Sequence, residues 1–210
     1  AQRDRMVTRQ IEARGVTDPR VLDAMRAVPR ERFVPDHLAE RADEDAPLPI
    51  GEDQTISQPY IVALMIEALG VGPGDRVLEV GAGSGYAAAV LSRIASEVVA
   101  IEWHASLANA ARDTIDALGY DNVTILHADG SKGRPERAPY DAILVSAGAE
   151  SVPDALLDQL APGGTMVIPI AAHSGVQSAG QQLERIRRTD AGLARESLGP
   201  VRFVPLRTAD

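Results

Sequence analysis

Short apolar runs alternate with alanine-rich or amphipathic stretches through the middle of the chain. Four runs have the length and composition of buried parallel strands, at 76–80, 97–101, 123–126 and 140–145. A fifth follows a proline-glycine turn, at 165–170. The stretches between them favour helices, at 86–95, 106–118 and 153–160. This alternation predicts an α/β fold of repeated βαβ units, with a parallel sheet and right-handed crossovers.

The two ends of the chain show different patterns. A charged helix over 4–14 is expected to end at Gly15, and a second helix begins at Pro19 with Asp18 as its N-cap. Residues 30–54 show no periodicity, and a third helix is expected over 59–69. Closing strands are predicted at 183–189 and 201–206, and a mobile loop at 171–181, which is rich in Gly, Ser, Ala and Gln.

The first predicted strand runs into a glycine turn, RVLEVGAGSG over 76–85. Gly81, Gly83 and Gly85 allow the backbone to turn sharply and a ligand to approach it, and the next helix offers free N–H groups at its start. The third glycine comes one place too early for the dinucleotide pattern G-x-G-x-x-G. The carboxylate of Glu79 would repel a pyrophosphate but suits a cationic or zwitterionic ligand. A purely structural tight turn is the alternative.

Acidic residues end the next two strands. Glu102 lies 102 − 81 = 21 residues after Gly81, close to the spacing of the carboxylate that holds a ribose in this kind of fold. Asp129-Gly130 follows the third strand, where an adenine amino group can find a carboxylate, although Asp-Gly turns are frequent. Because carboxyl ends of parallel strands share one edge, Glu79, Gly81, Glu102 and Asp129 are expected to form one site. Ser57, at a helix start, is by spacing alone a simple cap.

Composition excludes several classes of function. The net charge of −9 argues against broad nucleic-acid binding, which needs a basic surface. The absence of cysteine removes thiol catalysis and Cys-ligated zinc, and the four scattered histidines indicate no metal site. Because we find neither an 18-residue apolar run nor a signal peptide, we expect no membrane association and a cytoplasmic location. The lack of an evident exposed apolar face favours a monomer.

The chain resembles the protein-L-isoaspartate O-methyltransferases nearly from end to end. E-x-G-x-G-x-G at 79–85 resembles the first motif of S-adenosylmethionine-dependent methyltransferases in general, whose cofactor carries a sulfonium and no phosphate. The N-terminal block and the TISQP segment are specific to this family. The segments that carry the resemblance are 10–35, 48–65, 76–86, 138–147, 160–170 and 201–206.

The resemblance implies the fold and the activity. It implies a doubly wound, Rossmann-like class I methyltransferase sheet with extra N-terminal helices, in a single domain over 1–210. Residues 1–70 would supply the N-terminal helices and active-site segment, 71–170 the cofactor-binding core, and 171–210 a loop and closing strands. The implied reaction methylates the free α-carboxylate of L-isoaspartyl residues in damaged proteins and peptides and leaves S-adenosyl-L-homocysteine. The ester then closes unaided to a succinimide.

The resemblance also assigns roles to residues. Ser57 becomes the active-site serine, which reverses the interpretation as a cap. It need not be a nucleophile, because the acceptor carboxylate is already ionised at neutral pH and needs only to be held in line with the methyl group. Glu79 would orient the cationic cofactor. The other implied cofactor contacts are Thr55 and Ile56 closing over it, Gly81, Ala82, Gly83 and Ser84 along its methionine end, Glu102 at the ribose, and Asp129 and Gly130 at the adenine.

The chain departs from the family pattern at 131–134 and 147–150, and its 171–181 loop is longer than usual. Lys132 and Arg134 suggest a preference for acidic peptides. One alternative is a related O-methyltransferase that acts on aspartate of a dedicated ribosomal peptide to form a succinimide, although we expect an added C-terminal region there. A binding module without catalysis and a nicotinamide dehydrogenase are further alternatives.

Overall fold

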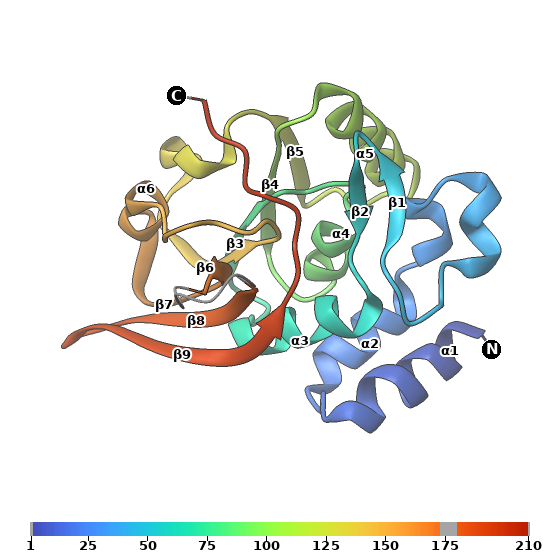
Figure 1. Cartoon of the computed structure of the whole chain (residues 1–210), viewed down its shortest axis with the longest axis horizontal. Coiled ribbons are helices and arrows are strands. Elements are labelled where there is room, and N and C mark those ends of the chain that lie inside the picture. The colour runs from blue at the N-terminus through green and yellow to red at the C-terminus, as the bar shows by residue number, and fades with distance from the viewer. Residues whose placement is uncertain (1, 173–179, 210) are drawn as a thin grey trace.

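A seven-stranded sheet with the order β5-β4-β3-β6-β7-β8-β9 forms the centre of the computed structural model, which describes residues 2–172 and 180–209 (Figure 1). The five strands from β5 to β7 in this order are parallel, and β8 and β9 extend them antiparallel. The strands are β3 (Arg76–Val80), β4 (Glu97–Glu102), β5 (Val123–His127), β6 (Tyr140–Val145), β7 (Leu160–Ala171), β8 (Gln181–Thr189) and β9 (Gly192–Val201). The predicted α/β class is confirmed.

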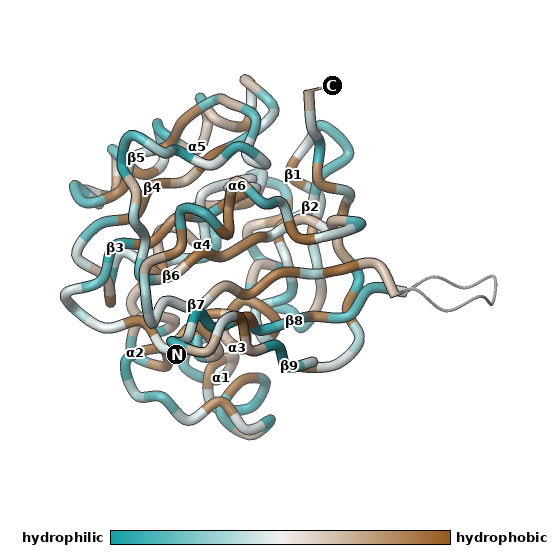
Figure 2. Tube along the Cα trace, turned by 90° about the vertical axis from the view of Figure 1, so that its left-hand side faces the viewer, coloured by the Kyte–Doolittle hydropathy of each residue, from teal (hydrophilic) through white to brown (hydrophobic). Residues whose placement is uncertain are grey.

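Both faces of the sheet are covered, which explains the nearly continuous apolar runs of its central strands. In β3, Val77 packs into one core cluster, whereas Leu78 and Val80 pack into the other. The first cluster contains the N-terminal helices, and the second contains the short α6. The helices are α1 (Gln2–Met6), α2 (Pro19–Ala27), α3 (Pro59–Leu69), α4 (Tyr86–Ser92), α5 (Ala105–Ala117) and α6 (Asp154–Asp158). Figure 2 shows long apolar stretches along the central strands.

The N-terminal predictions are confirmed with changes of detail. The helix expected over 4–14 starts as α1, continues through a π turn and a 3-10 turn, and ends at Gly15, whose φ is 100°. Asp18 caps α2 by accepting a hydrogen bond from the Arg20 N–H, with Pro19 in the first turn. Helix α3 ends at Gly70, which is left-handed as expected of a C-terminal glycine.

Residues 30–54 are more ordered than their lack of periodicity indicated. They form the 3-10 helices Arg30–Phe33 and Asp36–Arg41 and then enter a hairpin of β1 (Leu48–Gly51) and β2 (Gln54–Ile56). The hairpin turn contains Glu52 and Asp53 with φ of 52° and 55°. Tight hairpin turns of this kind normally carry Asn or Gly, so the sequence holds no recognisable turn motif here.

The C-terminal strand prediction was half right. β8 lies where a strand was expected, but the strand predicted at 201–206 is wrong, because β9 ends at Val201. β9 is an exposed, polar edge strand and therefore has no apolar run to mark it. Residues 161–164, predicted as a turn, belong to β7 in the structure. The pairing of β7 with β6 is irregular at this point. The mobile loop predicted at 171–181 concerns mainly 173–179, which lie outside the described residues.

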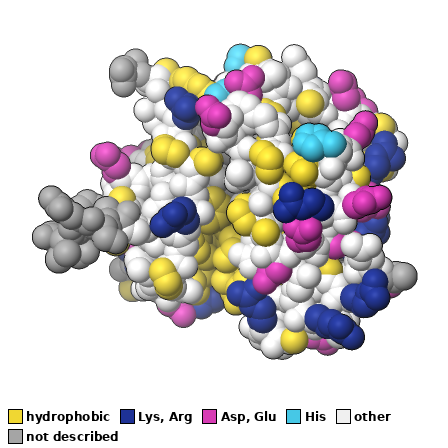
Figure 3. Space-filling model, turned by 45° about the vertical axis from the view of Figure 1, so that its right-hand side comes forward, with side chains coloured by type: hydrophobic (Ala, Val, Ile, Leu, Met, Phe, Trp, Pro, Cys, Tyr) yellow, Lys and Arg dark blue, Asp and Glu magenta, His cyan; other side chains and the backbone are white. Residues whose placement is uncertain are grey.

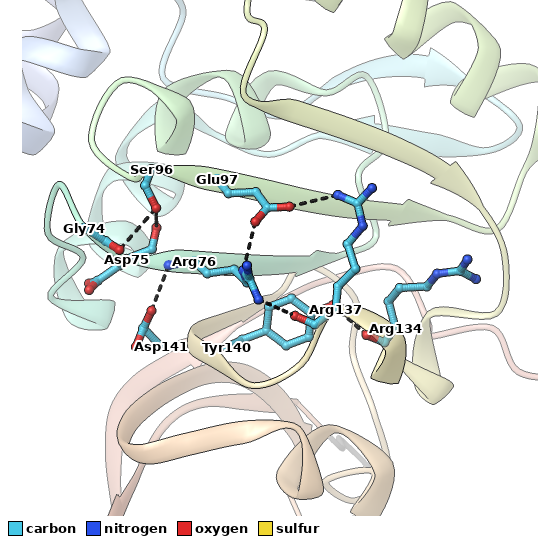
Figure 4. A network of polar contacts seen from close by, with 9 residues as sticks. All are labelled: Gly74, Asp75, Arg76, Ser96, Glu97, Arg134, Arg137, Tyr140 and Asp141. Atoms are coloured by element: carbon cyan, nitrogen blue, oxygen red, sulfur yellow. Dashed lines mark hydrogen bonds and ion pairs between the residues drawn. The ribbon is translucent and has the colours of Figure 1, made fainter.

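Charged side chains tie the amino ends of the central strands together (Figure 4). Arg76 Nε donates to one oxygen of Glu97, and an Arg137 guanidinium nitrogen donates to the other, both at 2.8 Å. The Arg76 N–H donates to Asp141 at the start of β6 at 2.8 Å. The opposite, carboxyl ends of these strands thus form the edge that is available for a site. No helix in the described ranges combines the length and apolarity needed to cross a membrane.

Candidate active site

The strand order reverses between β3 and β6, and this is where open α/β sheets bind ligands. Gly81 follows β3 and Ser146 follows β6, and the Ser146 N–H donates to Val80 O at 2.8 Å. The N–H groups of Gly81 and Ala82 both donate to Ile101 O, which fixes the turn against β4. The φ of Gly81 is 87°, in the region that favours glycine. Two adjoining cavities share Gly81, Gly83, Thr55 and Ser146.

Most of the predicted site residues meet at this switch point. The first cavity is lined by eight of them: Thr55, Ile56, Ser57, Glu79, Gly81, Ala82, Gly83 and Ser84. The second is lined by Glu102 and Gly130 together with Thr55, Gly81 and Gly83. The β1–β2 hairpin lies close to the glycine turn after β3. A Cβ on Gly83 would lie 3.2 Å from Cδ1 of Ile50 in β1. The structure thus brings ten of the eleven predicted residues to one place.

Glu79 is a buried carboxylate with few partners. It is 1% exposed, and its Oε1 accepts one long hydrogen bond, 3.5 Å, from Ser146 Oγ. Its Oε2 has no partner among the described residues. Burial, and next the nearby Glu102, raise the pKa of Glu79 well above its usual range. A buried carboxylate that lines a cavity and keeps one oxygen without a hydrogen-bond partner favours a cationic ligand.

Glu102 is held rigidly at the end of β4. It is 5% exposed, and its two oxygens accept backbone hydrogen bonds from Gly83 and His104, both at 2.8 Å. Each carboxylate oxygen keeps a further lone pair, so the group remains able to accept from two neighbouring hydroxyls. Trp103 and His104 line the same cavity beside it.

Asp129 is the predicted residue that the structure leaves out of both cavities. Its Oδ1 accepts from the Ser131 N–H and hydroxyl, and its Oδ2 accepts from the Ala209 N–H at 2.9 Å. Although burial opposes the shift, these hydrogen bonds lower the pKa of Asp129. Gly130 does line the second cavity, and a Cβ there would lie 2.5 Å from Val80 Cγ1, so only glycine fits.

Ser57 lies between β2 and α3 and does not cap the helix. Gln58 is the N-cap of α3, and no side chain accepts a hydrogen bond at that helix start. The Ser57 carbonyl accepts from the Arg30 guanidinium at 2.9 Å, whereas its hydroxyl has no partner in the described part of the chain. The interpretation as a cap, drawn from spacing alone, is therefore wrong.

A groove of about 570 Å³ adjoins the first cavity, with Thr55, Ser57 and Ser146 common to both. The other residues of the groove include Pro47, Ile61, Arg202 and Phe203. Figure 3 shows this face hollowed, with hydrophobic side chains at the bottom of the hollow. An extended, partly apolar chain lying in the groove would bring one of its side chains to Ser57.

Sequence reasoning missed several lining residues. Ser146 lines all three cavities, and its position directly after a predicted strand at the switch point was a usable indication. Trp103 directly follows Glu102 and was equally within reach. The segment 204–207, which also lines the second cavity, gave no such indication, because it reaches the site only through the fold. Its anchor is Gly148, whose N–H donates to Val204 O and whose carbonyl accepts from Leu206.

Lys132 and Arg134 line none of these three cavities. Lys132 lies 3.6 Å from Asp129, and Arg134 lies 3.3 Å from Glu136. The described residues contain no cluster of acidic, histidine or cysteine side chains that could hold a metal ion.

Comparison with known proteins gives a consistent result along the chain. The model of the family described as protein-L-isoaspartate(D-aspartate) O-methyltransferase matches residues 1–210. The chain is 56% identical over 207 residues to protein-L-isoaspartate O-methyltransferase 1 of Rhodopseudomonas palustris (strain HaA2), covering 98% of this chain and 83% of that protein. It is 58% identical over 205 residues to the protein-L-isoaspartate O-methyltransferase of Methylorubrum extorquens (strain PA1), covering 97% and 87%.

Solved structures agree with the sequence comparison. One named protein-L-isoaspartate O-methyltransferase superposes with a TM-score of 0.85 at 32% identity, covering 97% of this chain and 65% of that one. A Plasmodium falciparum structure, named as a candidate for the same enzyme and solved in complex with S-adenosyl-L-homocysteine, gives 0.82 at 28% identity, with 98% of both chains covered.

Proposed function

The chain belongs to the protein-L-isoaspartate(D-aspartate) O-methyltransferase family, and we propose that it methylates the free α-carboxylate of L-isoaspartyl residues in damaged proteins and peptides. The methyl donor is S-adenosylmethionine, and the product is S-adenosyl-L-homocysteine. One observation carries the assignment of the site. The unpartnered hydroxyl of Ser57 lies where the first cavity meets the groove, so a donor in one and a peptide in the other would meet there.

The residues of the two cavities fit this cofactor. When bound, S-adenosylmethionine supplies a methyl group activated by its attachment to a sulfonium. Glu79, buried with a free oxygen, would face the cationic part, and the glycine turn 81–85 would accommodate the methionine end. Glu102 would accept from the ribose hydroxyls, and Trp103 and Gly130 would border the base. Two carboxylates at the site suit a cation and disfavour a phosphate.

Ser57 would hold the acceptor. The carboxylate of an isoaspartyl residue is ionised at neutral pH, so no general base is needed. The Ser57 hydroxyl can donate one hydrogen bond to the acceptor and restrict its oxygen to an orientation suitable for attack. Thr55 and Ser146 flank the same position. In this proposal, most contacts to the acceptor would come from residues 1–70 and the C-terminal segment, and most contacts to the cofactor from 71–170, with Thr55 and Ser146 bordering both.

Methyl transfer from labelled S-adenosylmethionine to a matched pair of peptides, one isoaspartyl and one aspartyl, tests the proposal. We expect transfer to the isoaspartyl peptide alone. Transfer to neither peptide, with the cofactor still bound, would contradict the repair function and favour a dedicated substrate or a protein that only binds.

Ser57→Ala is expected to lower kcat/KM for the isoaspartyl peptide about 10- to 100-fold, the value of one hydrogen bond to a charged group. Cofactor affinity should stay nearly unchanged. Ser96→Ala is the matched control, because Ser96 donates to backbone carbonyls at the opposite edge of the sheet. A loss as large as that of a covalent nucleophile, or no loss at all, would contradict a holding role.

Peptide preference is expected to depend on Arg202, not on Lys132 and Arg134. Arg202 lines the groove and the other two do not, so Arg202→Ala should reduce the preference for acidic over neutral isoaspartyl peptides about threefold to tenfold, more at low salt. The double variant K132A/R134A serves as the control and should keep the wild-type preference. Competition between the two peptides measures the ratio, and the reverse ranking would restore the earlier hypothesis.

The proposal includes a monomeric, cytoplasmic enzyme without a nucleic-acid partner. The net charge of −9 supports the last point, because binding to phosphates needs a basic surface.

A further inference from the structure

Arg30 is the most deeply buried charged side chain near the site. It begins the 3-10 helix Arg30–Phe33 and is 0% exposed. Arginine is seldom fully buried without a carboxylate partner, because removing its charge from water is costly. The Asp43 carboxylate is close enough to interact with the charge of Arg30, but among the described residues no carboxylate is hydrogen bonded to it.

The guanidinium instead bonds to two backbone carbonyls. Arg30 Nε donates to Ala42 O at 2.7 Å, and a terminal nitrogen donates to Ser57 O at 2.9 Å. The other terminal nitrogen has no partner in the described ranges. The central carbon of the Arg30 guanidinium, Cζ, lies 4.8 Å from the centre of the Tyr86 ring, and Tyr86 lines the first cavity. Arg30 therefore connects two segments of the N-terminal region to a wall of the cofactor cavity.

The Arg30 guanidinium places a positive charge beside a site that gathers negative charges. Glu79 and Glu102 place two buried carboxylates at the site, and the proposed acceptor is a third anion. Repulsion between like charges is large where water is excluded. A cation bonded to the Ser57 carbonyl offsets this repulsion and also fixes the main chain that carries the hydroxyl.

We infer that Arg30 is a positioning residue for the acceptor, which acts through the main chain of Ser57. The inference rests on the proposed function for the identity of the acceptor, but its structural part, control of the 54–60 segment, does not. A guanidinium is required because separate nitrogens of one rigid group donate to the two carbonyls while its carbon lies over the Tyr86 ring, which an ammonium does not do. Lysine at this position would keep the charge and lose one of the two bridges.

The test compares Arg30→Met and Arg30→Lys with Arg112→Met. Arg112 is the matched control, since its Nε also donates to a backbone carbonyl, that of Ile125, on the other side of the cofactor-binding core. Each variant is measured in three ways: S-adenosyl-L-homocysteine affinity by calorimetry, kcat and KM for the isoaspartyl peptide, and amide hydrogen exchange of 54–60. Rates are normalised to the folded fraction.

For Arg30→Met we expect kcat to fall about 10- to 100-fold, because small misplacements of reacting groups have effects of this size, with cofactor affinity within about twofold of wild type. Arg30→Lys should show a smaller fall and tests the inference if the methionine variant does not fold. Exchange should speed up at 54–60 in both and stay unchanged there in Arg112→Met.

Two results would overturn the inference. One is unchanged exchange at 54–60 in the Arg30 variants, and the other is a loss of activity equal to that of Arg112→Met. If the wild type transfers methyl groups to neither peptide, the proposed function fails, and the exchange comparison still decides whether Arg30 controls the Ser57 segment.

Discussion

Replacing Glu102 with alanine should weaken S-adenosyl-L-homocysteine binding about 100- to 10,000-fold. The carboxylate would accept two hydrogen bonds from ribose hydroxyls, and bonds to a charged group contribute about 1.5–3 kcal/mol each. The side chain also holds the Gly83 and His104 N–H groups, so its removal loosens the glycine turn before any ligand arrives. Isothermal calorimetry measures the change in affinity directly.

Glu97→Ala provides the control for Glu102→Ala. Glu97 starts the same strand and bonds to Arg76 and Arg137 at the far edge of the sheet (Figure 4). Its loss should reduce stability modestly and leave cofactor affinity within about twofold of wild type, since surface ion pairs contribute about 0–1 kcal/mol. Equal losses in the two variants would show that Glu102 acts only through stability and would contradict its role at the ribose.

Glu79→Gln should have opposite effects on stability and on binding. Without a ligand, the buried carboxylate has one free oxygen and a like charge nearby, so its neutral replacement should raise the melting temperature by a few degrees at pH 8. Affinity for S-adenosylmethionine should fall about 10- to 100-fold, because a charge pair in a buried site is lost. S-adenosyl-L-homocysteine, without a sulfonium, should lose less.

The pH dependence follows from the raised pKa of Glu79. Its folded-state pKa lies above the ordinary value of 4.5, so the folded protein holds this proton more tightly than the unfolded chain. Its contribution to stability is therefore fully present below pH 4.5 and is lost as the pH rises through the folded-state pKa. A bound cation favours the ionised form, so S-adenosylmethionine should bind more tightly as pH rises and release a proton. Calorimetry in buffers of different ionisation enthalpy measures this proton, and Glu79→Gln should release less.

The part of the candidate site around the glycine turn was predictable because its residues follow from local rules. A buried strand, a glycine turn and a helix occur within twenty residues, and Glu79 and Glu102 each lie near the end of a strand whose apolar run is visible in the sequence. Parallel strands in sequence order then bring these ends to one edge. The order of β3, β4, β5 and β6 in the sheet confirms that step.

The part of the candidate site around Ser57 was not predictable from spacing. Ser57 has the spacing of a helix cap, and only the resemblance to a family indicated otherwise before the structure showed Gln58 in that place. The β1–β2 hairpin escaped detection because its strands are short and its turn uses Glu52 and Asp53 instead of glycine. β9 escaped because a polar edge strand carries no apolar run.

The sequence by itself determined the parallel part of the sheet, the glycine turn and the acidic residues near the strand ends, because each depends on neighbours a few residues away. Tertiary structure decided which polar groups are left free at the site. One oxygen of Asp129 accepts a hydrogen bond from the Ala209 N–H, 80 residues distant. Ser57 is held through its carbonyl by Arg30, 27 residues distant, with its hydroxyl free. Such pairings depend on how the whole chain packs, and no local pattern of residues encodes them.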